Sequence, residues 1–120
     1  MRHELRLLSN ASVYLVDESK KEIPANLENL SLHGLSIGSE EYVDIEPNSL
    51  YKIVIIPEKE SNLEKFELDV QSRWIKINKL KIKSGFFINI PIDQPELESY
   101  LKYLAMRGKD LTMPDEEDVT

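Results

Sequence analysis

The chain has 120 residues, a formal net charge of −7 and no cysteine. Its length supports one domain with one hydrophobic core. The acidic balance argues against a general binder of DNA or RNA, because lysine and arginine drive that binding. Disulfides and thiolate zinc sites are excluded. No apolar run reaches the roughly 18 residues of a membrane span, and no segment resembles a secretory signal, so we expect a cytoplasmic protein.

Short β-strands are predicted along most of the chain. Runs of β-forming residues, or of alternating apolar and polar residues, lie at 11–17, 23–37, 50–56, 66–77 and 81–92. Polar turns separate them. Five to seven such strands favour a small antiparallel barrel or sandwich. Within 23–37 the alternation changes phase between Leu27 and Leu30, which predicts a β-bulge near Glu28 and Asn29.

One amphipathic helix is predicted near the C-terminus, over residues 94–107. The apolar residues at helical spacing are Leu97, Tyr100, Leu101, Leu104 and Ala105. Asp93 is the expected N-cap. We expect the apolar face to close the open end of a barrel or to pack on a partner. Residues 108–120, with the acidic run Asp115–Asp118, are expected to form a disordered tail.

The run 29–34, Asn-Leu-Ser-Leu-His-Gly, is the most informative stretch. Its two leucines alternate with polar residues, which predicts a strand with one apolar face. The opposite face would carry Asn29, Ser31 and His33, whose side chains form hydrogen bonds. Gly34 tolerates unusual backbone angles and the close approach of a ligand. Taken alone, this face is either the solvent side of a sheet or the floor of a small-ligand site.

Catalytic groups are scarce. No serine lies in a Gly-x-Ser-x-Gly elbow, and no glycine-rich loop of the nucleotide-hydrolase type is present. The two histidines, His3 and His33, have no third ligand at metal-site spacing. We therefore expect no enzyme, metal or cofactor, and a hydrolase using His33 with surface carboxylates is the weakest alternative. The single tryptophan, Trp74, is expected in the core.

A ligand-binding set can nevertheless be assembled from the residues. Arg2 and Arg6 offer forked, permanently charged donors suited to phosphates and guanine edges. Asn29 and Ser31 add an amide and a hydroxyl, and Gly34 permits close approach. Such a set suits a compact, anionic, guanine-containing nucleotide. The alternative is two solvated arginines near a frayed terminus.

Two motifs in this order resemble the PilZ domain family. The run from Arg2 to Arg6 matches Arg-x-x-x-Arg, and the run 29–34 matches (Asp/Asn)-x-Ser-x-x-Gly. Strands containing Arg73-Trp74-Ile75 and Gly85-Phe86-Phe87 and a C-terminal helix follow. The resemblance covers roughly residues 1–106. It implies a stand-alone, six-stranded antiparallel β-barrel with a C-terminal α-helix, spanning residues 1–107, in which residues 1–8 form a flexible switch.

The resemblance also implies a function. Such a protein would be a bacterial receptor for cyclic di-GMP that changes conformation on binding and signals to an effector protein in motility, exopolysaccharide or virulence output. Arg2 and Arg6 would hold phosphates and guanines, and Asn29 and Ser31 would contact a guanine edge and a phosphate. Gly34 would allow the turn and the close approach. His33 fills a variable position and is added as a further candidate contact.

The resemblance leaves an alternative open. A PilZ-like interaction module can keep the fold and bind no nucleotide, for example in type IV pilus assembly. In either case we expect no catalytic residue, and the chain would be a monomer or a homodimer.

Overall fold

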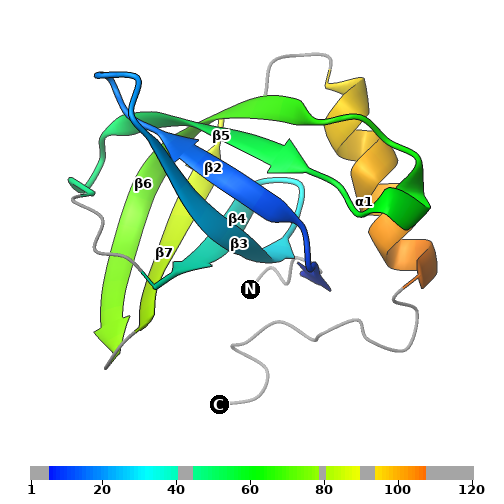
Figure 1. Cartoon of the computed structure of the whole chain (residues 1–120), viewed down its shortest axis with the longest axis horizontal. Coiled ribbons are helices and arrows are strands. Elements are labelled where there is room, and N and C mark those ends of the chain that lie inside the picture. The colour runs from blue at the N-terminus through cyan, green and yellow to red at the C-terminus, as the bar shows by residue number, and fades with distance from the viewer. Residues whose placement is uncertain (1–5, 41–44, 79–80, 90–93, 108–120) are drawn as a thin grey trace.

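The computed structural model describes residues 6–40, 45–78, 81–89 and 94–107. Arg2, His3, the expected N-cap Asp93 and the tail 108–120 lie outside these ranges. The described part is an antiparallel sheet curled into a barrel, with one helix against it (Figure 1).

Six strands close the barrel. In chain order the elements are β1 (Leu7–Leu8), β2 (Ser12–Val16), β3 (Glu22–Leu30), β4 (Gly34–Ser39), β5 (Leu50–Ile56), the 3-10 helix η1 (Lys59–Ser61), β6 (Phe66–Asn78), β7 (Lys81–Ile88) and α1 (Pro95–Arg107). The order β3-β2-β5-β6-β7-β4 closes because β4 pairs back to β3. Closure removes the sheet edges that would otherwise stay unpaired. The predicted fold, a six-stranded antiparallel barrel with a C-terminal helix, is confirmed.

The short strand β1 continues the barrel wall beside the end of β3. Leu7 pairs with Leu30 and Leu8 pairs with Asn29, whereas β2 pairs with the first half of β3. The β3–β4 register shifts between Leu27 and Asn29, which confirms the predicted bulge. The bulge and β1 therefore meet at Asn29, the first residue of the second motif.

The helix α1 closes one end of the barrel (Figure 1). Leu97, Tyr100 and Leu104 are 0%, 0% and 1% exposed and belong to the barrel core. Their spacing of three and four residues places them on one stripe of the helix. Leu101 is half-buried, but Ala105 is exposed. The buried stripe is thus narrower than predicted and does not include Ala105.

A polar cluster fastens α1 to distant parts of the chain. We call Ser9, Glu58, Tyr100 and Arg107 the helix clamp. The Tyr100 hydroxyl donates to Glu58 Oε1 at 2.6 Å, and Ser9 Oγ lies 2.7 Å from the same hydroxyl. Arg107 Nη1 forms an ion pair with Glu58 Oε2 at 2.8 Å. Because Glu58 follows β5 and Ser9 follows β1, the clamp joins three segments that are separate in sequence.

The clamp changes the acidity of its members. Burial by itself would raise the pKa of Glu58, but hydrogen bonds from Tyr100 and Asn10 and the charge of Arg107 outweigh it, so the pKa lies below the ordinary 4.5. Burial and the hydrogen bond to Glu58 raise the pKa of Tyr100. The interactions within the clamp therefore favour the state in which Glu58 is ionised and Tyr100 is neutral.

We expect acid to weaken the fold through Glu58. Because its pKa is lower in the folded than in the unfolded chain, its contribution is complete above the unfolded value and is lost as the pH falls through the folded one. Glu58→Gln should therefore show a smaller fall in Tm than wild type between about pH 6 and about pH 3, measured by circular dichroism. Equal falls in the two proteins would contradict this expectation.

Candidate functional site

Arg6 and Asn29, one from each motif, contact each other directly. Arg6 comes immediately before β1, and the pairing of β1 with the end of β3 brings it to Asn29. Arg6 Nη1 donates to Asn29 Oδ1 at 2.7 Å, and both residues are half-buried. A planar guanidinium held by a side-chain amide has a defined orientation, which suits it to recognise phosphate or a guanine edge.

Gly34 lies against the Arg6 guanidinium. A Cβ atom placed on Gly34 would lie 3.7 Å from Arg6 Nη2 and 3.2 Å from the carbonyl oxygen of Phe86. None of the described glycines has a positive φ, so unusual backbone angles are not the reason for this glycine. The close approach of the arginine and of the β7 backbone is the physical reason.

Ser31 and Leu32 face the opposite way from the prediction. The strand β3 ends at Leu30, and a turn follows, so the alternation does not continue. The Ser31 amide donates to the Gly34 carbonyl at 2.8 Å. Ser31 is 1% exposed, and its hydroxyl accepts from the Gly34 amide at 3.2 Å and donates to its carbonyl at 3.1 Å. Leu32 is instead 42% exposed. Ser31 therefore holds the turn that positions Gly34.

Three predicted contacts stay predictions. His33 is exposed beside Gly34, and its carbonyl accepts from the Ile88 amide at 3.0 Å, which ties the turn to the end of β7. A ligand contact from the His33 side chain or the Ser31 hydroxyl is untested by this geometry. Arg2, the partner of Arg6 in the first motif, lies outside the described residues.

An exposed aromatic ring next to Gly34 was not predicted as part of the site. Phe87 pairs with Gly34 across the β4–β7 ladder and is 45% exposed. The guanidinium of Arg73 lies 4.0 Å from the centroid of its ring. Rings and guanidinium planes of this kind offer stacking surfaces for bases. The sequence signal is the alternation Lys81-Ile82-Lys83, which, if continued, places Phe86 inward and Phe87 outward. By residue type alone, Phe86 and Phe87 are equally suited to the core.

The expectation that Trp74 lies in the core is wrong. The β6–β7 register shifts between Ser72 and Trp74, so Arg73 is an extra residue and the strand changes phase. Arg73 and Trp74 consequently both face outward, and Trp74 is 40% exposed. Its indole ring covers Gly85, where an added methyl group would overlap the ring.

The outer face of the β6–β7 hairpin beyond the bulge is cationic. Residues 73–78 and 81–89 contain Arg73, Lys76, Lys81 and Lys83 and no acidic residue. The neighbouring Glu28 carboxylate on β3 is paired with Lys81 at 3.7 Å and with Lys83 at 3.6 Å. On a chain of net charge −7, this is a surface that favours an anion.

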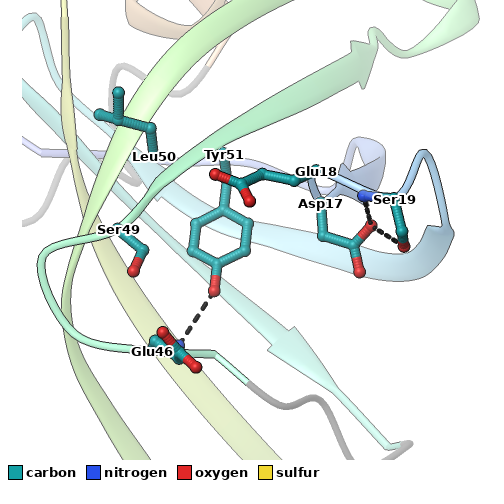
Figure 2. A pocket seen from close by; sticks show the side chains of 7 residues that line it. All are labelled: Asp17, Glu18, Ser19, Glu46, Ser49, Leu50 and Tyr51. Atoms are coloured by element: carbon teal, nitrogen blue, oxygen red, sulfur yellow. Dashed lines mark hydrogen bonds between the residues drawn. The ribbon is translucent and has the colours of Figure 1, made fainter.

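A separate hollow on the barrel is acidic. It is lined by Asp17, Glu18, Ser19, Glu46, Ser49, Leu50 and Tyr51 (Figure 2). The Ser19 hydroxyl donates to Asp17 at 2.7 Å, and this bond, with those from the Lys21 and Ser19 amides, lowers the pKa of Asp17. Asp17 thus organises the β2–β3 turn. Three carboxylates around the hollow repel a phosphate, so it does not compete with Arg6 as an anion site.

The residues 6–40, 45–78, 81–89 and 94–107 carry neither a metal-binding cluster nor a membrane-spanning helix. No group of three or more metal-ligating side chains occurs among these residues. None of the helices they form is long and apolar enough to cross a membrane.

The arrangement of Trp74 over Gly85 can be tested by fluorescence. Gly85→Ala should displace the indole ring and shift the emission of the single tryptophan to longer wavelength, because the ring loses its cover on the strand. Gly38→Ala is the matched control, since the nearest atoms to its new methyl group belong to the side chains of Glu28 and Lys81. Equal emission spectra for wild type and Gly85→Ala would contradict the arrangement.

Solved structures share this fold at low sequence identity. The inhibitor of motility MotI/DgrA from Bacillus subtilis matches with a TM-score of 0.76 and 18% identity, over 92% of this chain and 52% of that one. The PilZ domain of Escherichia coli YcgR, with c-di-GMP, matches with a TM-score of 0.71 and 14% identity, over 92% of this chain and 95% of that one. MrkH from K. pneumonia in its apo state matches with a TM-score of 0.70 and 14% identity, over 88% of this chain and 51% of that one.

These matches concern the fold. No protein-family model and no curated protein sequence matches the chain. The chain spans about half the length of MotI/DgrA and of MrkH, but nearly all of the YcgR domain. The chain therefore has the fold of PilZ domains, as the motif resemblance implied.

Proposed function

We propose that this chain is a receptor for cyclic di-GMP. The observation that carries the proposal is the contact between Arg6 and Asn29 beside Gly34, because it unites the two motifs in one cluster. The YcgR PilZ domain, which shares the fold, has a solved structure with c-di-GMP. The proposal is therefore supported by the local geometry of this chain and by one ligand-bound domain of the same fold.

The chemistry of the cluster fits a cyclic dinucleotide with two phosphates and two guanines. Arg6 supplies a charged planar fork, and its bond to Asn29 orients that fork above the Gly34 backbone. Phe87 and Trp74 expose aromatic surface for a guanine on the outer face of the barrel. Arg2 would add a second cation from the N-terminal switch, while Ser31 keeps the Gly34 turn in place.

The receptor would act through another protein. Ligand would order the N-terminal switch over the outer face of the barrel, and an effector protein would read the changed surface. The alternative remains a PilZ-like interaction module that binds its partner and no nucleotide. The two functions differ in one measurable property, the affinity for cyclic di-GMP.

Arg6→Ala should weaken cyclic di-GMP binding at least about tenfold, which corresponds to ~1.4 kcal/mol, because a charged hydrogen-bond donor to the ligand is lost. Isothermal titration calorimetry measures the affinity, with GTP and cyclic AMP as ligand controls. Lys65→Ala, which removes an exposed charge just before β6, is the matched control variant and should bind as wild type does.

The thermal transition of Arg6→Ala is expected to remain, so that loss of binding is separated from loss of fold. If wild-type protein gives neither heat nor a thermal shift with cyclic di-GMP, the receptor function is wrong. The nucleotide-free interaction module would then be the better account.

Asn29 provides a second test, because its role is to orient Arg6. Asn29→Asp keeps an oxygen acceptor for the guanidinium, whereas Asn29→Ala removes it. We expect the aspartate variant to retain binding within about threefold and the alanine variant to lose at least about tenfold. Titration calorimetry of both variants decides the matter, and equal affinities for the two would count against the orienting role.

A further inference from the structure

We propose that the helix clamp is a positioning device for Arg6. By holding residues 8–10 against α1 and against the segment after β5, the clamp fixes β1 beside β3 and so keeps the Arg6 guanidinium at Asn29. The importance of this device for ligand affinity rests on the proposed function. Its effect on the position of β1 is independent of that function.

The clamp contacts three consecutive residues that follow Arg6 by two to four positions. Arg107 Nη2 donates to the carbonyl of Leu8 at 3.2 Å. The Tyr100 hydroxyl bonds to Ser9 Oγ at 2.7 Å. Glu58 Oε2 accepts from the backbone amide of Asn10 at 3.2 Å. This density of contacts on one short segment is what a positioning role requires.

The strand β1 needs such support because it is so short. It contains only Leu7 and Leu8 and pairs with two residues of β3. A two-residue ladder forms few backbone bonds, and chain ends fray unless they are tied down. Leu7 is 6% exposed, so it supplies one apolar anchor. The clamp supplies the polar anchors immediately beyond it.

The donors and acceptors of the clamp form one chain of hydrogen bonds, from the Ala11 amide through Ser9 and Tyr100 to Glu58. Tyr100 has one hydroxyl proton, which it donates to Glu58. Ser9 must therefore donate to the Tyr100 oxygen, and Ser9 Oγ in turn accepts from the Ala11 amide at 3.0 Å. Ser9 and Tyr100 are 6% and 0% exposed. Removal of the Tyr100 hydroxyl leaves the buried Ser9 hydroxyl without this acceptor and takes one donor from Glu58, so Tyr100 is the central member of the clamp.

A consequence is that the ligand site and the helix are coupled. If docking of α1 stabilises the Arg6 position that binds ligand, ligand must stabilise docking of α1 by the same factor. Binding should therefore slow amide exchange in the second half of α1, which contains the clamp residue Arg107.

The test compares Tyr100→Phe with Tyr51→Phe. Each change removes one hydroxyl that forms a hydrogen bond. The hydroxyl of Tyr51, a half-buried residue, accepts from the Glu46 amide at 2.9 Å, outside the clamp. The first readout needs no ligand. The Ser9 amide donates to the Glu28 carbonyl at 3.2 Å, and its hydrogen exchange, followed by NMR, should be at least about tenfold faster in Tyr100→Phe and unchanged in Tyr51→Phe.

The second readout is the affinity for cyclic di-GMP by calorimetry. We expect Tyr100→Phe to weaken it at least about fivefold and Tyr51→Phe to leave it unchanged. Should Tyr100→Phe fail to fold, Arg107→Ala replaces it, because Arg107 lies in the last turn of α1 and contacts both Glu58 and Leu8. Lys102→Ala, an exposed cation on the same helix, is then the control.

The outcomes separate the two proposals. Equal Ser9 exchange in wild type and the clamp variant overturns the positioning role, whatever the ligand does. If the clamp variant shows faster Ser9 exchange but binds cyclic di-GMP as tightly as wild type does, the clamp holds β1 without serving the ligand site. That outcome also overturns the positioning role. If wild type binds no cyclic di-GMP, the receptor function fails, and the exchange readout alone decides whether the clamp positions Arg6.

Discussion

The pairing of β3 with β4 is the constraint on which both the barrel and the candidate site depend. This ladder is the one that closes the sheet. Its connecting turn, held by Ser31, ends β3 just after Asn29 and begins β4 at Gly34. The motif therefore serves the fold first, because closure of the barrel requires a tight turn at this point. The same turn brings Asn29 and the buried Gly34 to the one place where the Arg6 guanidinium lies against both.

The other half of the cluster depends on tertiary contacts. Arg6 belongs to no long element, and its position follows from β1, which is itself secured by the buried Leu7 and the helix clamp. A site built in this way combines a half on the barrel wall with a half that is held by a two-residue strand and by contacts from distant parts of the chain. The proposed receptor would gain from this division, because ligand binding could then alter a part of the surface without disturbing the core.

Local patterns predicted most of the elements and failed where a single residue changed the phase. The bulge at Glu28 was visible because Leu27 and Leu30 break the alternation, and the structure confirms it. The bulge at Arg73 was hidden, because Trp74 and Ile75 are both apolar and either could face inward. The predicted side of Ser31 is wrong for a related reason. The alternation predicts a continuous strand, but β3 ends at Leu30 and the residues of the following turn no longer point to opposite faces of a sheet.

The strand-rich character, the closing helix and the two motifs can be read from the chain alone, because they follow from periodicity and residue type over short windows. The contact of Arg6 with Asn29, the exposure of Trp74 and the link that Glu58 forms between the segment after β1 and α1 follow instead from the folding of the whole chain. The contacts that Arg6 forms with Asn29, and Glu58 with Asn10 and Tyr100, link residues 23 to 48 positions apart in the chain. Contacts over such separations depend on how the barrel closes, which no local pattern encodes. The exposure of Trp74 depends on the bulge at Arg73, which the apolar neighbours Trp74 and Ile75 conceal in the sequence.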